Sequence, residues 1–103
     1  MSDVEHYRKL ERMYAAAPVN SIFSPRLTVN DGQAEVVIPI HPGFFHAANA
    51  VHGSVYFKAM DDAAFFAANS LVKDYFVLTT SFTVYFVRPI SSGEMRAVTS
   101  PTL

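Results

Sequence analysis

The sequence predicts an α+β protein with mostly antiparallel strand pairing. Three observations indicate this class: two segments have helical spacing of apolar residues, three have strand patterns, and their order is helix, hairpin, helix, strand and partial strand. The 103 residues correspond to a single domain over 1–103. Half of the residues are hydrophobic and 17% are charged, a composition that excludes a disordered polar chain and predicts a packed core.

The charge and cysteine content exclude several classes of function. The formal net charge is −1, so we expect no nucleic-acid partner. The absence of cysteine excludes disulfides, thiolate metal ligands and cysteine nucleophiles, and it suits a reducing cytoplasm, which is the expected location. The most apolar stretch, residues 51–72, is interrupted by Lys58, Asp61 and Asp62, so we expect no membrane span and no membrane partner.

The first half of the chain is predicted to form an amphipathic helix and a β-hairpin. Apolar side chains recur at helical spacing over residues 3–17, and Pro18 ends the helix. A hairpin is expected over residues 26–40, because Asn30-Asp31-Gly32 tolerates the positive φ angles of a tight turn. From Ala34 to Ile40, apolar residues alternate with other residues in the pattern of a half-buried strand.

The second half is predicted to contain one buried helix and two strands. A loop over 41–50 precedes the helix, which is expected over 52–71. Alanine and phenylalanine cover nearly its whole circumference, which is typical of a buried helix. Residues 76–88 are rich in β-branched and aromatic types and predict the strongest strand, and a further strand is expected over 94–100.

Two adjacent aspartates interrupt the helix expected over 52–71. An ionised carboxylate buried without partners costs several kcal/mol, so each must face a polar cleft or find hydrogen-bond donors. Asp62 follows Asp61 by about 100° around the helix, so we expect at least one of them to face a cleft or an interface. The alternative is that the pair is a solvated interruption of the helix surface.

His52-Gly53 lies where the same helix is expected to begin. Backbone N–H groups without intrahelical partners and the positive end of the helix dipole point outward there, where they can bind a polarised carbonyl or an anion. A glycine lets a ligand approach the backbone closely, although it can equally ease the entry of the chain into the helix.

Three histidines, His41, His46 and His52, raise the alternative of a metal site. Their spacing matches no helical or zinc-finger pattern and no cysteine is present, so we expect no metal. No Gly-x-Ser-x-Gly turn and no phosphate-binding glycine loop occurs, so neither a serine nucleophile of that kind nor a nucleotide cofactor is expected. A histidine general base in the loop stays open.

These residues, taken together, resemble a known family. His52-Gly53-Ser54 followed by Asp61 is similar to the His-Gly-Gly…Asp signature of hotdog-fold acyl-CoA thioesterases of the phenylacetyl-CoA (PaaI) type. Residues 63–70 resemble the rest of that family's central helix. Residues 81–89, which end in Arg-Pro, resemble its third strand, so the resemblance covers about residues 20–100. It implies a hotdog fold, in which an antiparallel sheet wraps around a central helix.

The resemblance also implies roles for individual residues. Asp61 is the carboxylate that activates water or attacks the thioester, the Gly53 N–H polarises the thioester carbonyl, and Thr79 orients the water. The substrate-binding positions are His46, Asn49, His52, Ser54 and Arg88. Lys58 and Arg96 are further candidate cations for binding coenzyme A.

The sequence departs from the family pattern at four places. His46 stands where related members have asparagine, Asn49 where they usually have glycine, and Ser54 where they have a second glycine. Family members also continue beyond Leu103, so we expect the C-terminal strands of this chain to be missing or incomplete.

The sequence therefore predicts cofactor-independent hydrolysis of an acyl-CoA-type thioester. Gly53 and Asp61 are eight residues apart, which is about 12 Å along one helix, so Gly53 of one subunit must meet Asp61 of another. We accordingly expect a homodimer or a dimer of dimers. Two alternatives stay open: a non-catalytic acyl-binding or dimerisation module, and a hotdog dehydratase or hydratase, whose usual motif is not found.

Overall fold

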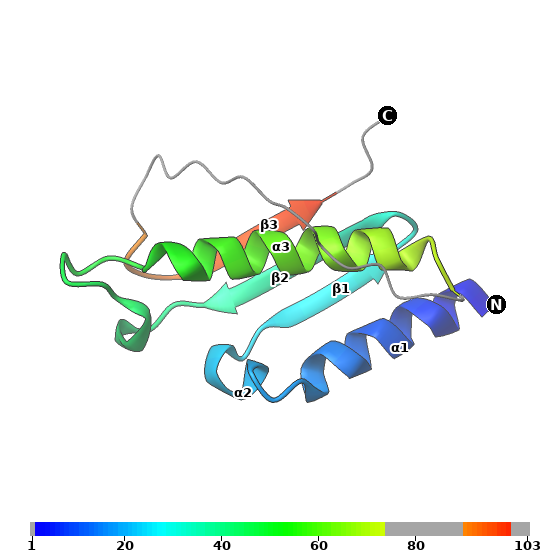
Figure 1. Cartoon of the computed structure of the whole chain (residues 1–103), viewed down its shortest axis with the longest axis horizontal. Helices are drawn as coiled ribbons and strands as arrows, with labels where there is room; N and C mark the ends of the chain where they lie inside the picture. Colours follow the sequence, from blue (N-terminus) through cyan, green and yellow to red (C-terminus); the bar gives the residue numbers. More distant parts are fainter. Residues whose placement is uncertain (1, 74–89, 100–103) are drawn as a thin grey trace.

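The computed structural model describes residues 2–73 and 90–99 (Figure 1). The strand expected over 76–88, with Thr79 and Arg88, lies outside these residues. The described elements are α1 (Ser2–Ala16), α2 (Asn20–Phe23), β1 (Arg26–Asn30), β2 (Gln33–Pro39), the short 3-10 helix η1 (Pro42–Phe44), α3 (Gly53–Ser70) and β3 (Glu94–Thr99). The mixed α+β class is confirmed.

The described strands form one antiparallel sheet in the order β1-β2-β3. Asp31 and Gly32 form the turn between β1 and β2, and Gly32 has a φ of 67°, in the left-handed region that glycine adopts without steric cost. The buried Ser70 at the end of α3 fixes this turn, because its hydroxyl accepts the Gly32 N–H at 2.7 Å. Pro39 ends β2, where a missing N–H is tolerated.

One face of the sheet is covered by α3, which runs along it (Figure 1). Val36 and Ile38 of β2 are fully buried against this helix, and so are Ala59 and Ala63 of α3. The small alanine side chains allow the helix backbone to lie close to the sheet. The sequence predicts a helix that is buried on all sides, but α3 is not: Phe57 keeps 39% of its surface exposed in the described structure.

The N-terminal helix α1 lies along β1, which is an edge strand among the described strands (Figure 1). Its apolar face contributes the buried Tyr7, Leu10 and Tyr14 to a second core cluster. The Arg8 guanidinium donates to the Val29 carbonyl at 2.7 Å, and the Glu11 carboxylate accepts the Val29 N–H at 2.8 Å. These side chains take the place of a neighbouring strand and satisfy backbone groups that an edge strand leaves open.

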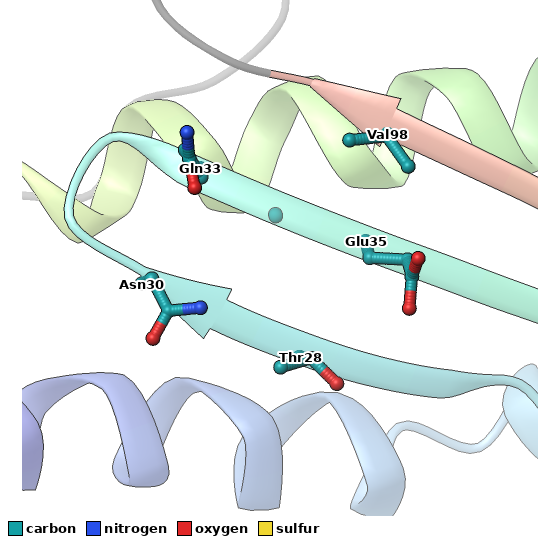
Figure 2. A pocket seen from close by; sticks show the side chains of 6 residues that line it. Thr28, Asn30, Gln33, Glu35 and Val98 are labelled. Atoms are coloured by element: carbon teal, nitrogen blue, oxygen red, sulfur yellow. The ribbon is translucent and has the colours of Figure 1, made fainter.

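The other face of the sheet is polar. Figure 2 shows Thr28, Asn30, Gln33 and Glu35 on β1 and β2, and they line a shallow depression of about 240 Å³ with Val98 of β3. Ion pairs between neighbouring side chains cross this face, Arg96–Glu35 at 2.8 Å and Arg26–Glu94 at 2.9 Å. Arg96 therefore lies on the face of the sheet away from α3 and pairs with Glu35. This position does not favour a role for Arg96 in binding coenzyme A at the start of α3.

The short helices α2 and η1 are the elements that the sequence analysis missed. Four residues are too few to show a helical period, and the loop expected over 41–50 contains η1. Pro42 at the first position of η1 and the His41 ring, which accepts the Gly43 N–H at 3.0 Å, stabilise this turn.

Candidate active site

The segment between η1 and α3 forms a closed loop that delivers the chain to the start of α3. Its two ends are joined by a β-bridge between Phe45 and Val51 and by the bond from the His52 N–H to the Phe44 carbonyl at 2.8 Å. A further bond from the Val51 N–H to the Ile90 carbonyl, also at 2.8 Å, ties the loop to the segment before β3. The first residues of α3 are therefore held by fixed backbone contacts.

Inside this loop, His46 and Asn49 shape the backbone. The His46 ring accepts the Ala48 N–H at 3.0 Å through Nδ1. Asn49 has a φ of 64°, in the left-handed region where glycine is favoured and asparagine is among the best-tolerated other residues. This conformation explains why asparagine can stand where the resembled family usually has glycine.

His52 caps the N-terminus of α3. Its Nδ1 accepts the Ser54 N–H at 3.0 Å and lies 2.9 Å from the Ser54 hydroxyl, while its carbonyl accepts the Val55 N–H at 3.0 Å. The N–H of Gly53 has no acceptor among the described residues. Gly53 is thus a first-turn residue whose N–H has no partner within the described part of the chain, and it lies at the positive end of the helix dipole.

Asp61 and Asp62 lie on different faces of α3. Asp61 is half-buried and lies about 200° around the helix from Ala59, so it is opposite the face that packs on the sheet. Asp62 faces α1, where the Tyr14 hydroxyl donates to its Oδ2 at 2.5 Å and the Lys58 ammonium donates to the same oxygen at 2.8 Å. The two carboxylates therefore lie on different sides of α3, Asp62 toward α1 and Asp61 away from the sheet.

The two partners of Asp62, Lys58 and Tyr14, are themselves largely enclosed by the fold. Lys58 is largely buried, and its ammonium lies 5.4 Å from the Tyr14 ring centroid and 5.0 Å from that of Phe23. Burial raises the pKa of the Tyr14 hydroxyl well above its usual range, and the hydrogen bond to Asp62 and the charge of Asp62 raise it further. The Lys58 ammonium is paired with Asp62 and packed against two aromatic rings, which does not favour a role for it in binding coenzyme A.

A shallow groove of about 320 Å³ opens beside the first turn of α3. It is lined by Ile22 and Phe23 of α2, by Phe44 and Phe45, and by His52 and Ser54. The aromatic pairs in the sequence gave no sign that α2 contributes to this groove. Its position depends on contacts between α2 and segments that are distant in sequence.

The described residues hold neither a metal site nor a membrane span. No group of three histidine, aspartate or glutamate side chains in 2–73 and 90–99 could hold a metal ion. His41, His46 and His52 instead each accept a backbone N–H two residues further along the chain. Within the same ranges, no helix combines the length and the apolar character needed to cross a bilayer.

Comparison with solved structures defines the fold. The conserved protein PA5202 from Pseudomonas aeruginosa superposes with a TM-score of 0.77 at 24% identity, covering 84% of this chain and 71% of that one. The E. coli PaaI protein from the phenylacetic acid degradation operon gives a TM-score of 0.81 at 19% identity, over 93% of this chain and 70% of that one. A thioesterase family protein from Silicibacter pomeroyi gives 0.80 at 25% identity, over 88% and 68%.

These likenesses define a hotdog fold, as the sequence resemblance predicts. The chain belongs to the thioesterase superfamily, whose sequence model matches residues 48–102, more than half of the chain. This match contains both Gly53 and Asp61, and it supports thioester hydrolysis in general terms. No curated protein matches the sequence significantly.

Proposed function

We propose that this protein hydrolyses an acyl-CoA-type thioester at a site shared between two subunits. The observation that carries the proposal is the position of Gly53 and Asp61 on α3 within the segment that matches the thioesterase superfamily. The Gly53 N–H stabilises the negative charge that develops on the thioester oxygen. One such donor is typically worth about 2.7–4 kcal/mol of the reaction barrier.

Asp61 supplies the carboxylate of the reaction. As a general base it removes a proton from water, and the oxygen of that water attacks the thioester carbon. As a nucleophile it attacks that carbon itself, and water then hydrolyses the resulting anhydride. In both routes the carbon–sulfur bond breaks, the sulfur leaves as a thiol after gaining a proton, and a carboxylic acid is formed. Thr79, outside the described residues, is proposed to orient the water.

The distance along α3 requires two subunits. Eight residues separate Gly53 from Asp61, which is about 12 Å along the helix axis, whereas the reacting groups must lie within about 3 Å of the same carbonyl. Two α3 helices packed antiparallel around a two-fold axis would place Gly53 of one subunit beside Asp61 of the other, twice per dimer. A homodimer, or a dimer of such dimers, is therefore part of the proposal.

The loop residues are proposed to act mainly through the backbone. His46 and Asn49 shape the loop, and His52 and Ser54 form the cap of α3, so that they hold the Gly53 N–H toward the substrate. Arg88, outside the described residues, is the remaining candidate cation for coenzyme A.

Release of free thiol from a panel of acyl-CoA esters tests the proposal. We expect release by the purified chain, and its loss in Asp61→Asn, which keeps the size of the side chain and removes the base. A chain that binds acyl-CoA but releases no thiol would instead be an acyl-binding module. Hydration of an unsaturated acyl-CoA without thiol release would indicate a hydratase.

A further inference from the structure

The groove beside α3 has the size and chemistry of a site for a small apolar group. Its volume of about 320 Å³ lies at the lower end of the range for small-molecule pockets, which is about 300–1,000 Å³. None of the described residues that line it is an Asp, Glu, Lys or Arg. Its lining includes Phe44 and Val55, whose side chains also belong to the main core cluster.

The α2 wall of this groove is held in place by contacts on both sides. The Phe23 ring stacks on the Phe44 ring with centroids 5.2 Å apart and planes inclined by 25°, and the Lys58 ammonium lies 5.0 Å from the Phe23 centroid. The buried Asn20 anchors the start of α2, because its amide donates to the Tyr14 carbonyl at 2.7 Å. A wall fixed in this way presents its surface without a cost for ordering it on binding.

Ile22 is the exposed part of that wall. It keeps 61% of its surface accessible to solvent although it lines the groove. A large apolar side chain contributes little to stability while it stays exposed, and apolar surface beside a concave site is typical of ligand binding. Val19, one turn earlier and 50% exposed, does not line the groove.

We propose that this groove holds the apolar acyl chain of the thioester and that Ile22 sets its preference for chain length. The inference rests on the proposed function: His52 and Ser54 flank the Gly53 N–H and also line the groove, so a carbonyl bound at that N–H can direct its alkyl substituent toward α2. The pantetheine arm on the other side of the thioester carries amide groups that need hydrogen-bond partners. Beyond His52 and Ser54, the groove is walled by apolar side chains of α2 and of the loop before α3, and this part of it suits the acyl chain.

Equilibrium binding of non-hydrolysable acyl-CoA thioethers of increasing alkyl length tests this assignment. Calorimetry on the full chain should show Kd falling by about fourfold for each methylene that enters the groove, until the groove is full. Ile22→Ala should weaken binding of the longer chains by about three- to tenfold and leave the shortest chain unchanged. Val19→Ala, the matched control on the same surface, should bind all chains like the wild type.

Three results would overturn the inference: a Kd independent of chain length, an Ile22→Ala profile equal to the wild type, or an equal loss in Val19→Ala. Both substitutions are at exposed positions, and circular dichroism checks that the variants stay folded. A failure of the proposed function can be distinguished from a failure of the groove assignment. Chain-length-dependent binding without thiol release contradicts hydrolysis and leaves the groove assigned, whereas hydrolysis with an unchanged Ile22→Ala profile contradicts the groove alone.

Discussion

The Tyr14 hydroxyl donates to Asp62 Oδ2 at 2.5 Å and joins α1 to α3 across 48 residues of sequence. Lys58 binds the same oxygen, so this carboxylate is held by two donors within the fold. The neighbouring Asp61 lies on another face of α3. The contacts of Asp62 therefore give that carboxylate a structural role between α1 and α3.

Replacing Asp61 by asparagine should mainly reduce activity, whereas replacing Asp62 by asparagine should mainly reduce stability. Asp61→Asn should lose nearly all thiol release, because a general base typically contributes about 10²–10⁴-fold, and it should change the free energy of unfolding little. Asp62→Asn should lower the free energy of unfolding by about 1–3 kcal/mol, because it removes the charge that pairs with Lys58, and it should retain most activity. Thiol release and urea unfolding measure the two effects, and the reverse ranking would assign the reaction to Asp62.

Tyr14→Phe should change stability at alkaline pH. The pKa of this hydroxyl is raised in the folded state by burial and by Asp62, from an ordinary value of 10.0. The folded protein then keeps a proton that the unfolded chain releases above pH 10. Its contribution is complete below pH 10 and falls as pH rises further, by at most about 1.4 kcal/mol per pH unit.

Urea unfolding of both proteins at several pH values from 8 to 11 measures this effect. The free energy of unfolding should fall less steeply above pH 10 in Tyr14→Phe, while the other tyrosines contribute equally to both proteins. Parallel curves for the two proteins would show that the environment of Tyr14 does not hold its proton.

Glu11→Ala should destabilise the protein through the edge of the sheet. The variant leaves the Val29 N–H without its acceptor and removes the ion pair with Arg8, at a cost of about 1–3 kcal/mol. Glu5→Ala is the matched control, since Glu5 is exposed on the same helix and should change the free energy of unfolding by less than about 0.5 kcal/mol. Equal urea midpoints for the two variants would contradict the role of α1 at this edge.

Two substitutions at Asn49 test the backbone of the loop. Asn49→Gly should keep the melting temperature, because glycine adopts the observed φ of 64° readily. Asn49→Ala should cost about 1 kcal/mol, since alanine is strained there. Thermal unfolding of both variants measures the difference, and equal melting temperatures would show that the loop does not depend on this conformation.

The fold class and the family could be predicted from the sequence because their signals are local. Periodicity, the Asp31-Gly32 turn and the spacing of Gly53 and Asp61 are all short-range patterns. α1 and α3 have bounds within one residue of those expected, the hairpin spans 26–39 against an expected 26–40, and β3 begins at the expected Glu94. Short-range patterns do not report which distant segments meet.

The parts of the site that escaped prediction depend on such tertiary contacts. The sequence placed Asp61 and Asp62 about 100° apart on a helix, but only the structure shows that Asp62 is the one that meets Tyr14 of α1. The contribution of α2 to the groove was missed for the same reason, since Phe23 meets Phe44 through packing across 21 residues of sequence.

In the proposed enzyme, one catalytic site combines Gly53 of one subunit with Asp61 of its partner. Gly53→Pro deletes the proposed N–H donor at the first position of α3, where proline is well tolerated. The preceding His52, with φ of −62° and ψ of 143°, already has the backbone conformation that a residue before proline requires. This variant therefore removes the donor and leaves the helix in place.

Mixing Gly53→Pro with Asp61→Asn under conditions of subunit exchange tests whether the site is shared. Each homodimer should be inactive, whereas a mixed dimer should contain one site with both lesions and one intact site. Random exchange should therefore restore about a quarter of the wild-type sites, measured as thiol release from an acyl-CoA that the wild type hydrolyses. If the mixtures stay inactive while both variants are folded, dimeric and shown to exchange, the shared site does not exist.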